Sequence, residues 1–183
     1  MSNPKIIKVK YQISEMKPEM VKAVEKLRYQ SWLDTYINEE YGTTKQFIDE
    51  RFSQRLSKDG LEKLRQRIIE NQNNPGALNL VARNNQGEIV GIVVATKGAE
   101  GNEVCAIYTK KEVHGKGVGR DLMQAALDWI GDDKEVELGV VSYNERAQAF
   151  YRKFGFEKVG EPVINKFETM PEQKMIKRVK KRR

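Results

Sequence analysis

A single cysteine and a single histidine occur in this chain of 183 residues. One cysteine cannot form an internal disulfide, so the sequence excludes a disulfide-stapled domain and favours a reducing compartment. We therefore expect a cytoplasmic protein, and we expect no metal cofactor. Long apolar runs are also missing, because no window approaches the ~20 residues that span a bilayer. The first residues, Met-Ser-Asn-Pro-Lys, lack the apolar core of a signal peptide.

The composition that remains is typical of a globular protein, with 39% hydrophobic and 32% charged residues. We expect a single domain over residues 1–183, with its core at about 4–179 and a basic tail at 180–183. The net charge is +7, yet residues 174–183 alone contain seven basic residues and no acid. The rest of the chain is neutral, which argues against a broad nucleic-acid-binding face. The tail is either a solvated terminus, which we favour, or a contact with ribosomes or RNA.

Hydrophobic periodicity and turn residues divide the chain into alternating elements. Three helical segments come early, and a break at Asp59-Gly60 separates the second from the third. The expected helices are Glu19–Tyr36, a second one capped by Thr43 or Thr44, a third from Leu61 to about residue 73, Val118–Ile130 and Asn144–Phe154. The expected strands are Lys5–Ile13, Leu78–Ala82, Ile89–Thr96, Glu103–Thr109, Val136–Val141, Phe156–Gly160 and about Phe167–Val179.

This order of elements predicts an α/β (α+β) fold. A strand, a helix and a strand follow one another around residues 103–141, which predicts a right-handed crossover and a parallel pair. Short turns elsewhere predict antiparallel pairing. We therefore expect a mixed, mostly antiparallel sheet of about six or seven strands, with a central parallel pair and helices on both faces.

The turn at residues 114–120 carries the clearest functional signal. Three glycines alternate there (Gly115, Gly117 and Gly119), directly before an amphipathic helix. Glycines let backbone N–H groups converge, and a helix N-terminus adds partial positive charge, so the turn suits a phosphate or pyrophosphate. No Ser or Thr follows a Gly-Lys pair, and the glycine spacing is not Gly-x-Gly-x-x-Gly, which argues against a P-loop and a dinucleotide site. Coenzyme A remains, with Lys116 and Arg120 adding positive charge.

The turn His114-Gly-Lys-Gly-Val-Gly119 resembles the Gln/Arg-x-x-Gly-x-Gly/Ala pyrophosphate motif of the GNAT acetyltransferase superfamily. A second segment, from Val140 to Phe156, resembles that family's fifth strand and the helix after it, including Tyr151-Arg-Lys-Phe-Gly-Phe156. The resemblance in element order extends from Lys5 to Val179. His114 departs from the usual Gln or Arg. Because this position acts mainly through its backbone amide in the family, we expect cofactor binding to be retained.

The resemblance implies an acetyl-coenzyme A (acetyl-CoA) site. Backbone groups near the end of the fourth strand would hold the pantetheine arm and polarise the acetyl carbonyl, commonly at a β-bulge. The loop would hold the pyrophosphate, and Asn144, a natural N-cap, would also contact the cofactor. The implied cofactor-binding residues are Ile107, Tyr108, Thr109, His114, Gly115, Lys116, Gly117, Val118, Gly119, Arg120, Asn144 and Tyr151.

The same resemblance assigns catalytic roles. Tyr151 would donate a proton to the leaving thiolate, although an aromatic at this spacing can also be a packing residue. Glu103 is the first candidate for the base that deprotonates the amine, and Glu137 is the second. Both strand carboxylates can equally be solvent-facing. We interpret Cys105 as a small core residue, because no second histidine supports an acyl-cysteine mechanism.

The acceptor pocket of this fold would lie between the early helices and the last hairpin. Trp32, Tyr36 and Glu39 combine aromatic faces with negative charge, which suits a cationic amine, although a buried stripe with a solvated face has the same pattern. We therefore expect an N-acetyltransferase that acts on a primary amine of a polyamine-like small molecule or a peptide, by direct attack in a ternary complex. A non-catalytic acyl-CoA sensor or ribosome-associated module, another acyl donor and a homodimer stay open.

Overall fold

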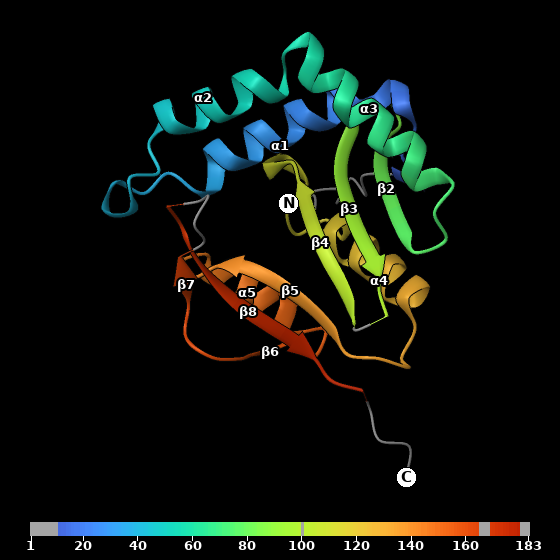
Figure 1. Cartoon of the computed structure of the whole chain (residues 1–183), viewed down its shortest axis with the longest axis vertical. Coiled ribbons are helices and arrows are strands. Elements are labelled where there is room, and N and C mark those ends of the chain that lie inside the picture. Colours follow the sequence, from blue (N-terminus) through green and yellow to red (C-terminus); the bar gives the residue numbers. More distant parts are fainter. Residues whose placement is uncertain (1–10, 100, 165–168, 180–183) are drawn as a thin grey trace, which may run out of the picture.

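The computed structural model describes residues 11–99, 101–164 and 169–179. A single mixed sheet of eight strands lies at its centre, in the order β1-β2-β3-β4-β5-β8-β6, and β7 also pairs with β8 (Figure 1). The strands are β1 (Tyr11–Glu15), β2 (Ala77–Asn84), β3 (Ile89–Lys97), β4 (Asn102–Thr109), β5 (Val136–Val141), β6 (Glu157–Lys158), β7 (Val163–Ile164) and β8 (Pro171–Lys177).

Helices cover both faces of this sheet, as predicted. One face of the β1–β4 half carries α1 (Val21–Thr35), α2 (Lys45–Arg55) and α3 (Lys58–Gln72), whereas α4 (Val118–Ile130) and α5 (Glu145–Arg152) lie on the other face (Figure 1). Three 3-10 turns complete the order: η1 (Pro18–Met20), η2 (Glu39–Tyr41) and η3 (Lys111–Val113). Pairing is antiparallel except between β4 and β5, which confirms the predicted parallel pair. The additional strand is the two-residue β7.

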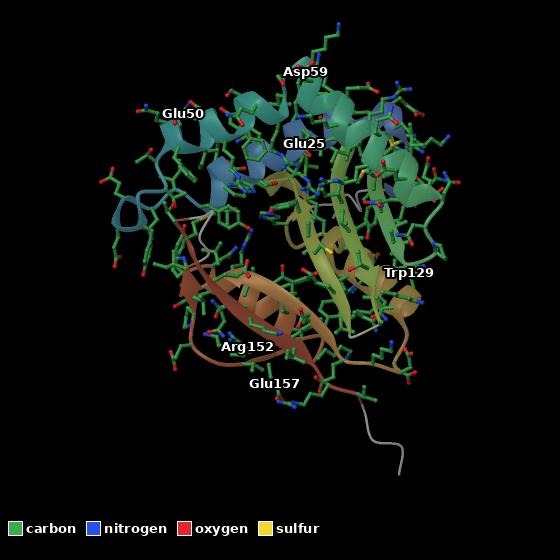
Figure 2. The ribbon with its side chains drawn as sticks, in the orientation of Figure 1. Glu25, Glu50, Asp59, Trp129, Arg152 and Glu157 are labelled. Carbon is green, nitrogen blue, oxygen red and sulfur yellow. The ribbon has the colours of Figure 1, made fainter. Side chains whose placement is uncertain are left out.

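Two apolar layers hold the helices to the sheet. On the α4 side, Leu122 and Met123 are fully buried in one cluster with Val93. On the other side, Val24 and Leu27 of α1 pack in a cluster with strand and α3 residues. Each fully buried side chain of this kind contributes on the order of 1.5–3 kcal/mol. Figure 2 shows the outer face of the helical layer, where Glu50 and Asp59 point to solvent while Glu25 lies inside.

One predicted boundary is wrong. The Asp59-Gly60 pair does not break the chain between two helices but lies in the first turn of α3. Ser57 begins the helix instead, because its Oγ accepts a hydrogen bond from the Gly60 amide at 3.1 Å. A Cβ at Gly60 would lie 2.1 Å from the Gln54 carbonyl oxygen, so this glycine permits the tight connection between α2 and α3.

The first predicted strand extends two residues further, to Glu15, and the last predicted strand is shorter than expected. In the N-terminal strand, the described part runs over Tyr11–Glu15, and residues 5–10 lie outside the described range. The last strand begins at Pro171, and residues 165–168 and 180–183 also lie outside that range. Among the described residues, no helix is long and apolar enough to cross a bilayer.

Candidate active site

The hydrogen-bonding ladder of the sheet splits where β4 and β5 separate. These strands pair only through Asn102 with Val136 and Glu103 with Glu137. From residue 104 onwards, β4 pairs with β3 alone and β5 pairs with β8 alone. Each strand therefore presents a row of unpaired N–H and C=O groups to the space between them. An extended polar ligand can pair with these groups as a strand would.

A β-bulge lies on β4 just beyond the point where its pairing with β5 ends. Val104 pairs with Ala95 and Ala106 pairs with Val94, so Cys105 is the extra residue. The Cys105 side chain is exposed, so our expectation of a core cysteine is wrong. Its Sγ lies 3.6 Å from Thr96 Oγ1, and partial desolvation raises the pKa of the thiol. The bulge lies at Cys105, two residues before the Ile107–Thr109 stretch near which we expect it.

The glycine loop follows β4 directly. Gly115 has a φ of 75° and Gly117 a φ of 93°, both in the left-handed region that favours glycine. Gly117 is the N-cap of α4 and supplies no side chain to its first turn. No backbone or side-chain acceptor among the described residues takes a hydrogen bond from the amides of Gly115, Gly117, Val118, Gly119 and Arg120. Five free amides at the N-terminus of a helix fit the pyrophosphate of coenzyme A.

Two contacts fix the sides of the loop. His114 Nδ1 contacts the Arg146 guanidinium, and burial, followed by the Arg146 charge, lowers the pKa of His114. The imidazole is therefore neutral at neutral pH and accepts a hydrogen bond from Arg146. On the opposite side, the Tyr11 hydroxyl donates to Asp121 Oδ2 at 2.5 Å and ties β1 to the first turn of α4.

Tyr151 and Asn144 are placed by α5. Asn144 caps that helix, since its Oδ1 accepts a hydrogen bond from the Ala147 amide at 3.1 Å, as predicted. Tyr151 is 8% exposed and packs edge-on against Phe150 and Phe156. Burial raises the pKa of Tyr151, and the nearby Tyr108 hydroxyl raises it further. No described residue hydrogen-bonds its hydroxyl, so Tyr151 offers a neutral phenol whose proton is uncommitted.

The predicted acceptor residues fall into two environments. Trp32 is 7% exposed, and its indole N–H donates to the Tyr108 hydroxyl at 3.2 Å, so it links α1 to β4 from within the core. Tyr36 packs edge-on against Trp32, and burial raises the pKa of its hydroxyl. Its carbonyl accepts a hydrogen bond from Tyr143 at 2.9 Å. Glu39 is exposed on η2.

The two candidate bases are adjacent but not equivalent. Glu103 and Glu137 are register partners on β4 and β5, and both are exposed. Glu137 forms an ion pair with Lys174 of β8. Glu103 has no ion-pair partner within the described ranges, and it lies two residues before the bulge. Among those residues, no group of His, Cys, Asp and Glu side chains could hold a metal ion.

Comparison with known proteins shows to which family this chain belongs. The sequence profile of the acetyltransferase (GNAT) family matches residues 31–156, well over half of the chain. The chain belongs to the GNAT acetyltransferase family. Members of this family use acetyl-CoA, so the protein is an acetyl-CoA-dependent N-acetyltransferase.

Solved structures agree with this GNAT assignment at the level of the fold. A PaiA N-acetyltransferase from Thermoplasma acidophilum in complex with coenzyme A is 24% identical, with a TM-score of 0.70 over 92% of this chain and 99% of that chain. A GNAT acetyltransferase from Streptococcus pneumoniae is 20% identical, with a TM-score of 0.68 over 93% and 100%. The ribosomal-protein-S18-alanine N-acetyltransferase from Escherichia coli is 13% identical, with a TM-score of 0.64 over 95% and 97%.

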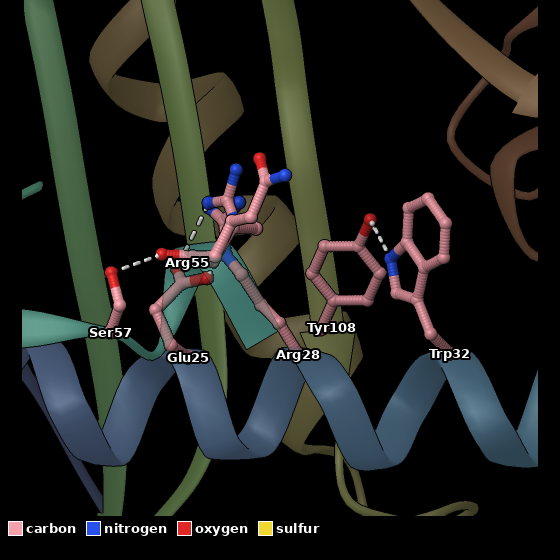
Figure 3. A network of polar contacts seen from close by, with 7 residues as sticks. Glu25, Arg28, Trp32, Arg55, Ser57 and Tyr108 are labelled. Atoms are coloured by element: carbon pink, nitrogen blue, oxygen red, sulfur yellow. Dashed lines mark hydrogen bonds and ion pairs between the residues drawn. The ribbon is translucent and has the colours of Figure 1, made fainter. Parts of the chain in front are cut away.

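One polar network of this GNAT enzyme was not predicted. Glu25 of α1 is 2% exposed and accepts two hydrogen bonds from Arg55, at 2.6 and 3.1 Å. Arg28 lies one helical turn further along α1, with its guanidinium 5.6 Å from the centre of the Tyr108 ring (Figure 3). The i,i+3 spacing of Glu25 and Arg28 was visible in the sequence. The contact with Arg55 has no local signal, because it spans 30 residues.

Proposed function

We propose that this enzyme transfers the acetyl group of acetyl-CoA to a primary amine of a polyamine-like small molecule or a peptide, by direct attack in a ternary complex. The observation that carries the proposal is the separation of β4 from β5 after two residue pairs, next to the β4 bulge, with the Tyr151 phenol near Tyr108 of β4. Acetyl-CoA supplies a thioester whose carbonyl carbon accepts the nucleophile.

The donor would be held along β4 and at the glycine loop. Along Ile107, Tyr108 and Thr109, alternate residues turn their backbone groups away from β3, where a pantetheine arm would pair with them. The loop amides from Gly115 to Arg120 would bind the pyrophosphate, with Lys116 and Arg120 beside them and His114 at the loop entrance. Asn144 would contact the donor from the start of α5.

The transfer needs three proton movements. An alkylammonium ion with a pKa of ~10.4 must lose a proton, and Glu103, free of an ion pair, would take it directly or through water. The amine nitrogen then forms a bond to the carbonyl carbon as the carbon–sulfur bond breaks. The leaving sulfur keeps the electron pair and receives the Tyr151 proton. The acylated nitrogen loses its second proton to water, and a proton from water restores the Tyr151 phenol. Backbone N–H groups at the bulge would stabilise the oxyanion. Tyr36 and Glu39 would border the amine, and Trp32 would support Tyr108 from behind.

The test combines binding with turnover. Titration calorimetry should show acetyl-CoA binding, and thiol release should accompany acetylation of at least one amine in a panel of amino acids, peptides and polyamines. Intersecting double-reciprocal plots would support the ternary complex, whereas parallel plots would contradict it. Glu103→Gln should lower kcat by ~10²–10⁴, and Glu137→Gln should act far less, because Glu137 is already paired. Donor binding without thiol release from any amine would overturn the proposal.

Two further predictions concern the partners of this enzyme. The basic tail includes residues 180–183, which lie outside the described range, and a role in ribosome or RNA contact would appear as salt-dependent RNA binding that is lost when they are deleted. A homodimer would appear in sedimentation analysis as twice the chain mass.

A further inference from the structure

A cavity of about 200 Å³ lies on the helical side of β4, next to the bulge. Its floor includes Cys105 and Ala106, and its walls come from α1, α3 and the end of α2. The proposed mechanism places the acetyl carbonyl at this bulge. A group that occupies the cavity would therefore lie beside the reacting atoms, on the face opposite α4.

The cavity lining carries more positive than negative charge. Its charged members are three arginines (Arg28, Arg55 and Arg67) and one carboxylate (Glu25). Glu25 accepts two hydrogen bonds from Arg55. It also lies 3.6 Å from Arg28 Nε, which makes no hydrogen bond. Three arginines and one carboxylate give the lining a net charge of +2.

Several hydrogen-bond donors around the cavity have no acceptor among the described residues. The Arg28 side chain is only 22% exposed, and no hydrogen bond is made by its guanidinium, which lies over the Tyr108 ring. Arg67, on α3, makes no ion pair within the described ranges. Asn79 of β2 is 7% exposed and lines the cavity without a side-chain hydrogen-bond partner in the same part of the chain. A planar guanidinium held in place with free N–H groups is suited to a carboxylate.

We propose that the acceptor amine carries a carboxylate, which Arg28 and Arg67 bind in this cavity while the amine lies at the bulge. This inference rests on the proposed function, and it narrows the acceptor class. Tyr108, beneath Arg28, lies two residues beyond Ala106, and a strand rises ~3.3 Å per residue. A carboxylate at Arg28 and an amine at the bulge are therefore offset along β4 by about two residues, ~6–7 Å. This separation matches an acidic amino acid or an acidic N-terminal residue, and the excess positive charge disfavours a polyamine.

Paired acceptors test the inference through turnover. Thiol release is measured with L-glutamate against L-glutamine, with Glu-Ala-Ala against Gln-Ala-Ala, and with spermidine. The wild-type enzyme should prefer the acidic member of one pair, and which pair responds tells a free amino acid from a peptide. Arg28→Gln and Arg67→Gln should each lower kcat/KM for that acidic acceptor by ~10- to 100-fold, mainly through KM, and leave its amide counterpart nearly unchanged. Arg65→Gln, on the same helix but outside the cavity, should change neither.

Binding of glutarate, which has carboxylates and no amine, separates this inference from the proposed function. Calorimetry should show glutarate binding to the wild type and to Arg65→Gln, and a loss of binding in Arg67→Gln. That result without acetylation of any amine would leave the anion site standing and refute the transferase mechanism. Preference for spermidine, equal losses for acidic and amide acceptors, or no difference in glutarate binding between Arg65→Gln and Arg67→Gln would overturn the inference. Thermal unfolding of each variant controls for folding.

Discussion

Replacing Gly117 with alanine tests the donor site without changing any charge. Gly117 has a φ of 93°, and a Cβ added there would lie 3.4 Å from the Tyr11 hydroxyl oxygen, an ordinary contact distance. The effect must therefore come from the backbone. Holding a non-glycine residue in the left-handed region costs about 1–2 kcal/mol. The loop can relieve this cost only by rotating the peptide groups that flank Gly117.

That rotation would turn at least one free amide away from the pyrophosphate. A hydrogen bond to a charged group contributes roughly 1.5–3 kcal/mol, so the loss of one lowers acetyl-CoA affinity by ~10- to 100-fold. Calorimetric titration with acetyl-CoA measures the affinity, and thermal unfolding measures the strain. We expect both to change in Gly117→Ala.

Gly87→Ala is the matched control. Gly87 lies in the β2–β3 hairpin turn with a φ of 79° and no atom within 4 Å of an added Cβ. It should lower stability by a similar amount and leave acetyl-CoA affinity at the wild-type value. Wild-type affinity in Gly117→Ala, or an equal loss of affinity in both variants, would refute the assignment of the loop as the pyrophosphate site.

Three other expectations follow from named contacts. Tyr151→Phe should lower kcat by ~10²–10⁴ at unchanged acetyl-CoA affinity, as measured by thiol release and calorimetry; a fall in affinity with unchanged kcat would indicate packing alone. Glu25→Gln should lower the free energy of unfolding by about 2–3 kcal/mol in urea titrations, because it leaves Arg55 without its buried carboxylate, and the exposed Glu50→Gln should stay within ~0.5 kcal/mol. The Tyr11–Asp121 hydrogen bond should give stability a pH dependence at both extremes.

The signs of that dependence differ at the two ends. The hydrogen bond from Tyr11 lowers the pKa of Asp121, so its contribution is present above the unfolded pKa of ~3.9 and is lost as pH falls through the folded value. Burial and the hydrogen bond to Asp121 raise the pKa of Tyr11 to about 12. Its contribution is full below pH ~10 and is lost as pH rises towards 12. Tyr11→Phe should flatten both limbs in urea titrations; unchanged limbs would show that the pair contributes nothing.

Local patterns predicted most elements of this fold because most of their signals are local. The continuous apolar run at Ile89–Thr96 is β3 almost to the residue, and Val136–Val141 is β5 as predicted. The failure at Asp59-Gly60 has a physical cause. An Asp-Gly pair is typical of a turn. Here Gly60 lies inside a helix instead, because the Ser57 side chain caps that helix and the Gln54 carbonyl approaches Gly60 closely.

The donor side of the candidate site has local sequence signals, whereas the acceptor side depends on tertiary contacts. The glycine loop and Tyr151 lie in contiguous motifs, so their sequence neighbours identify them. Cys105 was misplaced because the faces of β4 are covered by tertiary packing, which buries Val104 and leaves the next residue, Cys105, exposed. The cavity was missed for a similar reason. Arg28, Arg55 and Arg67 come from three helices, and only tertiary packing brings them together.

Helix α1 connects the acceptor cavity with the glycine loop of the donor side. Arg28 faces the acceptor cavity, whereas Asp34 and Thr35 line a small pocket of about 160 Å³ with His114 and Arg146 at the glycine loop. These positions are about 10 Å apart at a rise of 1.5 Å per residue. Donor phosphates at the loop would fix the far end of α1, and with it the orientation of Arg28 over Tyr108. Acetyl-CoA should then bind first, and product inhibition by coenzyme A that is competitive with acetyl-CoA and noncompetitive with the amine would show it. Random-order kinetics would mean that α1 is already rigid without the donor.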